Sequence, residues 1–184
     1  LLNILCTLIE AAGLLFIIAI GIKYWGSVNY LEMPKNLSTA SGSDILMVIL
    51  QGAVITFYSF IGFEDILNVS EEVKDPERNV PKGLITAMLI STAIYMAVAI
   101  TAVSVVPYAE LGTSGAPLMD VAKRAAPWFT NIDSLYVGIA IFAIANTALL
   151  NYLMGSRLLY GMSTQGLLPS ILSRLHPTRH TPYI

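Results

Sequence analysis

Four long apolar stretches dominate this 184-residue sequence and limit what it can fold into. They cover residues 1–25, 45–67, 84–106 and 134–159, and the third stops just before Pro107. A bilayer core of about 30 Å is crossed by roughly 20 apolar residues in a helix that rises ~1.5 Å per residue. Each stretch is long enough to cross, so the sequence predicts an all-α transmembrane protein with four membrane-spanning helices.

The composition agrees with a membrane protein and excludes several other classes. Hydrophobic residues make up 55% of the chain and charged residues 12%, whereas soluble domains have about 25% charged residues. The chain therefore lacks the polar residues to cover a water-soluble enzyme. A net charge of −2 leaves no basic excess to neutralise phosphates, so we expect no nucleic-acid partner. The single cysteine, Cys6, cannot form an internal disulfide.

Loop charges predict which side of the membrane each loop faces. The loop 70–83 and the segment from the end of the fourth helix through the tail 160–184 hold six of the ten basic residues: Lys74, Arg78, Lys82, Arg157, Arg174 and Arg179. By the positive-inside rule both segments are cytoplasmic. On the outer side, Pro117 fits a helix start capped by Ser114 or Thr113, and Pro127 ends it. We expect a surface helix over residues 115–127, with an irregular loop as the alternative.

The beginning of the sequence predicts a fragment. Leu1 is not a start methionine, and no basic segment precedes the first apolar stretch. The chain therefore starts inside a membrane helix, and we expect 1–184 to be a single membrane-domain fragment of a longer protein.

Polar side chains inside the apolar stretches are expensive in lipid and mark candidate functional positions. Glu10 lies in the middle of the first stretch, and Asn146 and Asn151 lie in the fourth. For Glu10 two interpretations stay open: a carboxyl that titrates facing the bundle, or a protonated donor to another helix. The two asparagines are interpreted first as hydrogen-bonding links between helices.

The segment from Phe57 to Asp65 predicts an interruption of the second helix. Ser59 and Gly62 are small residues, and Glu64 follows Gly62 closely. Backbone groups released by such an interruption can line a cavity and hold an ammonium, a carboxylate or an ion. The alternative is an ordinary helix in which Gly62 packs against a neighbour.

Enzymatic chemistry finds no support in the sequence. His176 and His180 are four residues apart, but Pro177 interrupts the helix that would align them as metal ligands. No nucleophile elbow, phosphate-binding loop or dinucleotide fingerprint is present. We therefore expect no enzyme, no metal site and no cofactor.

Two motifs resemble the amino acid–polyamine–organocation (APC) superfamily of permeases. The stretch YSFIGFEDILNVSEEVKDPERNVPKG is similar to that family's sixth helix and following loop, with matches at Phe60, Gly62, Phe63, Glu64, Glu71, Glu72, Lys74, Pro76, Arg78 and Pro81. SRLLYGMSTQGLLP resembles the segment that leaves the family's eighth helix. There Ser163, Thr164 and Gln165 replace the usual Ala-Arg-Asp.

The resemblance covers the whole chain as helices five to eight of a twelve-helix transporter. It implies a five-plus-five inverted-repeat (LeuT-like) fold whose substrate lies between discontinuous helices one and six. By the same resemblance, the following positions bind substrate: Tyr58 as an aromatic gate, Ser59, Phe60, Ile61 and Gly62 as the unwound segment, and Asn151 on helix eight. Glu64 and Glu10 are the implied coupling positions for a proton or sodium ion. Several relatives carry a lysine near position 10, so the acid there reverses the local charge.

Together these features favour secondary active transport of amino acids or related amines, by alternating access, as an antiporter or proton symporter in the plasma membrane. The expected partners are a small-molecule substrate, the lipid bilayer and the remaining helices of the parent transporter. The alternative is a truncated or accessory four-helix membrane bundle without transport activity of its own.

Overall fold

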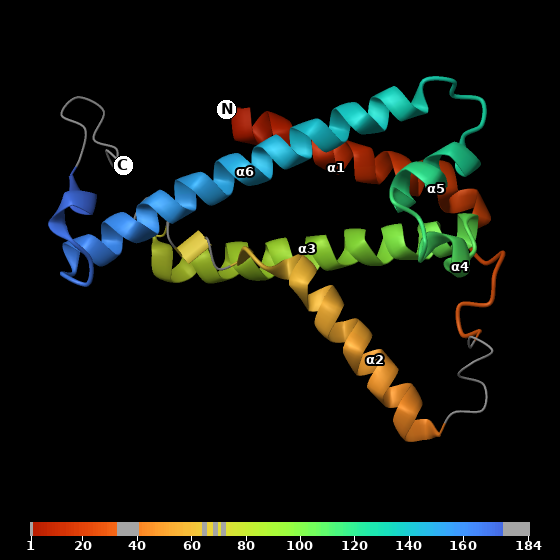
Figure 1. Ribbon diagram of the computed structural model, residues 1–184, viewed down its shortest axis with the longest axis horizontal. Helices are drawn as coiled ribbons and strands as arrows, with labels where there is room; N and C mark the ends of the chain where they lie inside the picture. Colours follow the sequence, from red (N-terminus) through yellow and green to blue (C-terminus); the bar gives the residue numbers. More distant parts are fainter. Residues whose placement is uncertain (1, 33–40, 64–65, 68–69, 71–72, 175–184) are drawn as a thin grey trace. The chain divides into compact units, whose positions relative to one another are not determined.

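The computed structural model describes residues 2–32, 41–63, 66–67, 70 and 73–174, and this part of the chain contains helices and no strand. The elements are α1 (Leu2–Gly21), η1 (Ile22–Tyr24), α2 (Gly42–Phe57), η2 (Tyr58–Phe60), α3 (Pro76–Val105), α4 (Tyr108–Leu111), α5 (Pro117–Ala125), α6 (Ile132–Thr164) and η4 (Ser170–Ser173) (Figure 1). Four segments are long and apolar enough to cross a membrane: Leu2–Tyr24, Gly42–Phe60, Pro76–Val105 and Ile132–Thr164.

The second span differs from the expected helix over 45–67. α2 starts earlier, at Gly42, because Ser41 and Asp44 form a capping box in which the Ser41 N–H donates to Asp44 Oδ2 at 3.1 Å. The α-helix stops at Phe57 and tightens into the single turn η2. Gly62, two residues after η2, has φ +107, a conformation that ends regular helix and that glycine adopts at little cost.

The third span also starts earlier than the expected residue 84, so part of the predicted loop 70–83 is helical. Pro76 opens α3, where its missing N–H is not needed. Asn79 stabilises this first turn, because its Nδ2 donates a hydrogen bond to the Lys74 carbonyl at 2.6 Å. Pro81 lies inside the helix without ending it.

The fourth span runs past the expected end at 159 into the predicted tail 160–184. It ends with a Schellman motif: the Leu167 N–H donates to the Met162 carbonyl at 3.0 Å and the Gly166 N–H donates to the Ser163 carbonyl at 3.1 Å. Gly166 has φ +76, which this cap requires. The position of the glycine, rather than the loss of apolar character, therefore sets the helix end.

The chain divides into two compact units. Unit 1 comprises Leu1–Gly13, Asp65–Val80 and Asp133–Ile184, and unit 2 comprises Leu14–Glu64 and Pro81–Ile132. In unit 1 the first half of α1 packs on α6. A Cβ at Gly13 would lie 3.0 Å from Ile139 Cδ1, so the missing side chain allows this close approach.

In unit 2 the end of α1 packs closely against α3. A Cβ at Gly21 would lie only 2.1 Å from Thr101 Cγ2. The indole Nε1 of Trp25 donates to Thr101 Oγ1 at 2.9 Å, and Thr101 is fully buried. Ser104, one turn further along α3, bonds to the Tyr30 hydroxyl at 2.8 Å. Small and hydroxylated residues thus hold these two spans together.

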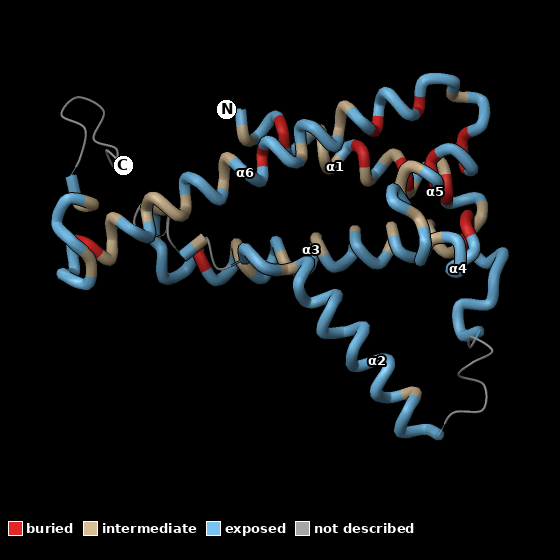
Figure 2. The backbone as a smooth tube through the Cα atoms, in the orientation of Figure 1, coloured by how far each residue is buried: buried red, intermediate tan, exposed pale blue. Residues whose placement is uncertain are grey.

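Two short helices follow α3. α5 covers Pro117–Ala125, within the 115–127 range in which the sequence predicts a surface helix, and Figure 2 shows buried residues along it. Its N-cap residue is Ala116 rather than Ser114 or Thr113; Ser114 instead bonds through Oγ to the Asp120 carboxylate. An ion pair of 3.0 Å between Arg124 and Glu110 links α5 to α4.

Candidate functional site

The backbone leaves regular helix at the segment Tyr58–Gly62, which we call the break segment. Its first three residues form η2, and Ile61 then adopts an extended conformation with φ −60 and ψ 137. The Ile61 N–H donates to the Tyr58 carbonyl at 3.2 Å, which closes the last turn. Gly62 follows with positive φ. Leaving the α-helical ladder here turns backbone groups away from the helix axis, which is how discontinuous helices form binding sites.

The side chains of the break segment are accessible in the described structure. Tyr58 is 75% exposed and Ile61 58% exposed. α2, which precedes the break segment, has no buried residue (Figure 2). Tyr58 and Ile61 of the break segment are therefore accessible, whereas Phe60 is half-buried.

Tyr95 of α3, which lies in neither sequence motif, contacts the break segment. The Tyr95 hydroxyl donates to the Ser59 carbonyl at 3.2 Å. The Tyr95 ring also packs edge-on against Phe60, with ring centroids 5.2 Å apart and an interplanar angle of 71°. A tyrosine in an apolar helix carries one polar group that seeks a partner, and this is the signal that could have indicated Tyr95.

Glu10 and Asn146, which the sequence singled out separately, lie together in unit 1. Asn146 Nδ2 donates to Glu10 Oε1 at 3.1 Å and approaches Thr7 Oγ1 at 3.4 Å. Thr7 and Glu10 are three residues apart and so share one face of α1. This contact links α1 and α6 through polar groups, as the sequence interpretation of Asn146 expects.

In the Asn146 amide the nitrogen has hydrogen-bond partners and the oxygen has none within the described residues. The residue is 4% exposed, and within the described residues its Oδ1 has no hydrogen-bond partner. A buried acceptor without a donor costs free energy, so such groups are uncommon in native structures.

Asn151 is not part of the contact between Glu10 and Asn146. Asn151 lies on α6 five residues after Asn146 and is exposed; at about 100° per residue it points to a different side of the helix. Glu64 lies outside the described residues, so its prediction stays as it was. The break segment belongs to unit 2, and Glu10 and Asn151 belong to unit 1.

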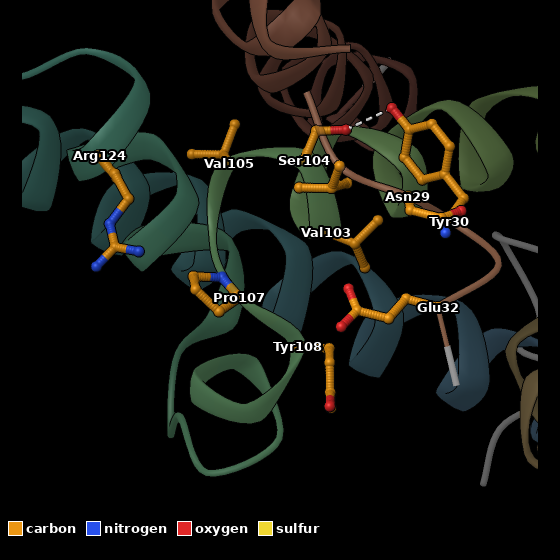
Figure 3. Close-up of a pocket in the computed structure, with 10 residues that line it drawn as sticks. Asn29, Tyr30, Glu32, Val103, Ser104, Val105, Pro107, Tyr108 and Arg124 are labelled. Carbon is orange, nitrogen blue, oxygen red and sulfur yellow. Dashed lines mark hydrogen bonds between the residues drawn. The ribbon is translucent and has the colours of Figure 1, made fainter. Parts of the chain in front are cut away.

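Unit 2 also contains an open pocket of about 510 Å³ (Figure 3). It is lined by residues 28–30, Glu32, residues 103–105, Pro107, Tyr108 and Arg124. The hydrogen bond between Tyr30 and Ser104 lies at its edge. None of the site residues predicted from sequence lines this pocket.

Comparison with known proteins identifies transporters along the whole chain. The family model "Amino acid permease" matches residues 1–184. The methylthioribose transporter of Bacillus subtilis is 33% identical over 98% of the chain, which is 37% of that protein. The branched-chain amino acid permease BcaP of Lactococcus lactis is 31% identical over 95% of the chain and 37% of that protein. The cationic amino acid transporter 9, chloroplastic, of Arabidopsis thaliana is 36% identical over 71% of the chain and 22% of that protein.

The chain thus spans between about a fifth and somewhat over a third of the length of these relatives. No solved structure matches it. The four apolar helices and these relatives point to a multi-pass integral membrane protein. Because the family model covers every residue and named permeases and transporters match nearly the full chain, the protein belongs to the amino acid permease family of the APC superfamily.

Proposed function

We propose that the chain carries part of the substrate site of a secondary active transporter for amino acids or related amines, working by alternating access. The break segment is the observation that carries this proposal. Here a membrane-spanning helix ends in a 3-10 turn that is followed by a positive-φ glycine, and transporters use interruptions of this kind to bind polar ligands. Membership of the permease family supports the same function.

In this proposal the backbone of Ser59–Gly62 binds the α-amino group of the substrate. Carbonyl oxygens accept hydrogen bonds from an ammonium, and interrupted helices in transporters use them in this way. Tyr58, which is 75% exposed, occludes the substrate as an aromatic gate. Asn151 contributes from helix eight of a twelve-helix, five-plus-five inverted-repeat fold.

Two carboxyl groups are proposed for coupling to a proton or sodium ion. Glu10 is supported by its position at mid-span and by its contact with the half-satisfied amide of Asn146. Glu64 is supported by its place two residues after Gly62, the last residue of the break segment. We propose the plasma membrane as the location of the transporter. One of the relatives carries the word chloroplastic in its name.

The names of the relatives suggest the substrates to test. They include a branched-chain amino acid permease, a cationic amino acid transporter and a methylthioribose transporter. L-Leucine and L-arginine represent the amino acids. Methylthioribose is the second candidate, because that relative covers 98% of the chain. It is a sugar without an α-amino group, so it separates the two ligand classes.

Uptake by the complete protein in proteoliposomes tests the proposal. We expect accumulation of radiolabelled L-leucine or L-arginine, stimulated by excess unlabelled substrate inside the vesicles, since a carrier that alternates returns faster when loaded. Uptake of methylthioribose alone would replace the amino acid assignment. Absence of uptake and counterflow for all three compounds contradicts transport and leaves the accessory-bundle alternative.

The variant Glu64→Gln belongs in the same assay. We expect it to abolish or uncouple uptake driven by a pH gradient while counterflow persists, because glutamine cannot release a proton. A pH response like that of the unsubstituted protein would remove Glu64 from the coupling mechanism.

A further inference from the structure

Tyr95 on α3 contacts the break segment through two different parts of its side chain. Its hydroxyl donates to the Ser59 carbonyl at 3.2 Å, and its ring packs edge-on against Phe60 with centroids 5.2 Å apart. Figure 1 shows the C-terminal end of α2 reaching α3 partway along its length. Ser59, Phe60 and Tyr95 all belong to unit 2, so the contacts lie within one compact unit.

The acceptor of this hydrogen bond, the Ser59 carbonyl, lies beyond the end of the α-helix α2. Ser59 lies in the single 3-10 turn η2, after the last residue of α2. A carbonyl there depends on a partner outside its own helix, because lipid offers none. Tyr95 supplies that partner from a continuous 30-residue helix, so the direction of the Ser59 carbonyl is set by α3.

The ring contact fixes the neighbouring residue. An edge-on aromatic pair has a preferred geometry and restricts both rings more than aliphatic packing does. With the hydroxyl on Ser59 and the ring on Phe60, Tyr95 restrains two consecutive residues of the break segment. A rotation of this segment about its backbone would break both contacts together.

We propose that Tyr95 is a positioning residue for the substrate site: it orients the Ser59 carbonyl and the Phe60 ring so that the break segment is preorganised for an ammonium-bearing substrate. This inference rests on the proposed function, because the ammonium is the group that function assigns to the segment. A carbonyl oxygen has two lone pairs. The phenol occupies one of them and leaves the other for the ammonium.

A structural role alone would give a different result from a positioning role. If Tyr95 only joined two helices, its loss would lower the amount or the stability of folded protein, and the remaining molecules would bind substrate normally. If Tyr95 positions the site, folded protein without the hydroxyl binds the ammonium less well. The apparent affinity therefore separates the two roles.

The experiment compares Tyr95→Phe, which removes only the hydroxyl, with Tyr95→Leu, which also removes the ring. The complete protein is reconstituted in proteoliposomes, and uptake of L-leucine and L-arginine is measured per folded molecule. For Tyr95→Phe we expect KM to rise about two- to tenfold, the factor that corresponds to one neutral hydrogen bond, with the maximal rate retained. For Tyr95→Leu we expect a larger rise in KM.

The matched control is Tyr108→Phe. It removes the same hydroxyl from an exposed tyrosine of α4, outside the break segment, and KM is expected to stay unchanged. An unchanged KM in Tyr95→Phe contradicts the proposal, and so does a fall in maximal rate alone. If the unsubstituted protein transports neither amino acid, the proposed function is contradicted. The role of Tyr95 is then tested by a second measurement that needs no transport.

The second measurement does not depend on transport. Ser59→Cys is introduced in a Cys6→Ala background of the complete protein, and its rate of modification by a small methanethiosulfonate reagent is compared with and without Tyr95→Phe. Loss of the restraint is expected to change this rate severalfold, whereas Tyr108→Phe leaves it unchanged. Equal rates with Tyr and Phe at position 95, including no reaction in either, overturn the proposal.

Discussion

Glu10 lies at the middle of the first span, where an ionised carboxyl without partners is unfavourable. Asn146 meets it from α6 and donates at 3.1 Å, and Thr7 lies beside it on the same face of α1. The nitrogen of the Asn146 amide thus has a partner, whereas its oxygen Oδ1 has none within the described residues. This contact in mid-span is the reason for proposing Glu10 as a coupling residue.

The variant Glu10→Gln tests this assignment. Glutamine keeps an oxygen that accepts from Asn146 but cannot exchange a proton. We therefore expect substrate uptake to stop responding to an imposed pH gradient. The free energy of unfolding is expected to change by less than about 0.5 kcal/mol, because the glutamine oxygen still accepts the hydrogen bond from Asn146 Nδ2. Proteoliposome uptake at several imposed pH gradients, with thermal unfolding in detergent, measures both quantities.

Asn146→Leu is the control for that experiment. It removes the partner and leaves the carboxyl in place, so we expect a loss of about 1–3 kcal/mol of stability with the pH response weakened rather than abolished. A Glu10→Gln protein that keeps the full pH response shows that Glu10 has a structural role only.

At the scale of the elements, α1 and α3 approach closely at one position. A Cβ at Gly21 would lie 2.1 Å from Thr101 Cγ2, a distance that real side chains do not adopt. Thr101 cannot move away easily, since it is fully buried and its hydroxyl accepts from Trp25 and donates to the Ala97 carbonyl at 2.7 Å. This helix pair therefore depends on a residue without a side chain, as membrane helices often do.

Gly21→Ala is expected to destabilise the complete protein by about 1–3 kcal/mol through overpacking. Thermal unfolding in detergent measures the effect. The double variant Gly21→Ala with Thr101→Ser supplies the control, because serine keeps the hydroxyl for Trp25 and lacks the methyl group that clashes. Recovery of most of the lost stability is expected. If Thr101→Ser gives no rescue, the close contact between α1 and α3 does not explain the effect.

For the molecule as a whole, the proposed transporter and a bundle that only associates with other helices predict different responses to a ligand. Ligand binding distinguishes the two, because a ligand that binds only the native state raises stability with its concentration, by about 2.7 kcal/mol at 100 times Kd. We expect L-leucine or L-arginine to raise the unfolding temperature of the complete protein in detergent. No stabilisation by any amino acid or amine in a panel would favour the accessory bundle.

The class of the protein and the approximate positions of its spans can be predicted from the sequence alone. Hydropathy over about 20 residues is a local property that the bilayer imposes, so four apolar stretches are visible without any knowledge of packing. The fixed spacing of the motif around Phe60 and Lys74 was equally local, and it indicated the permease family that the comparison then showed. Helix ends were predicted less well, because hydropathy does not register a capping box at Ser41 or a Schellman motif at Gly166.

Which polar residues contact each other depends on how the helices pack. Glu10 and Asn146 are separated by 136 positions and Ser59 and Tyr95 by 36, and hydrophobic periodicity carries no information about partners at such separations. The sequence could mark Glu10 and Asn146 as unusual, but the contact between them depends on how α1 and α6 pack. Tyr95 carried no motif at all. Its role follows from where α3 passes the break segment, because a side chain acquires a positioning function from its neighbours in space.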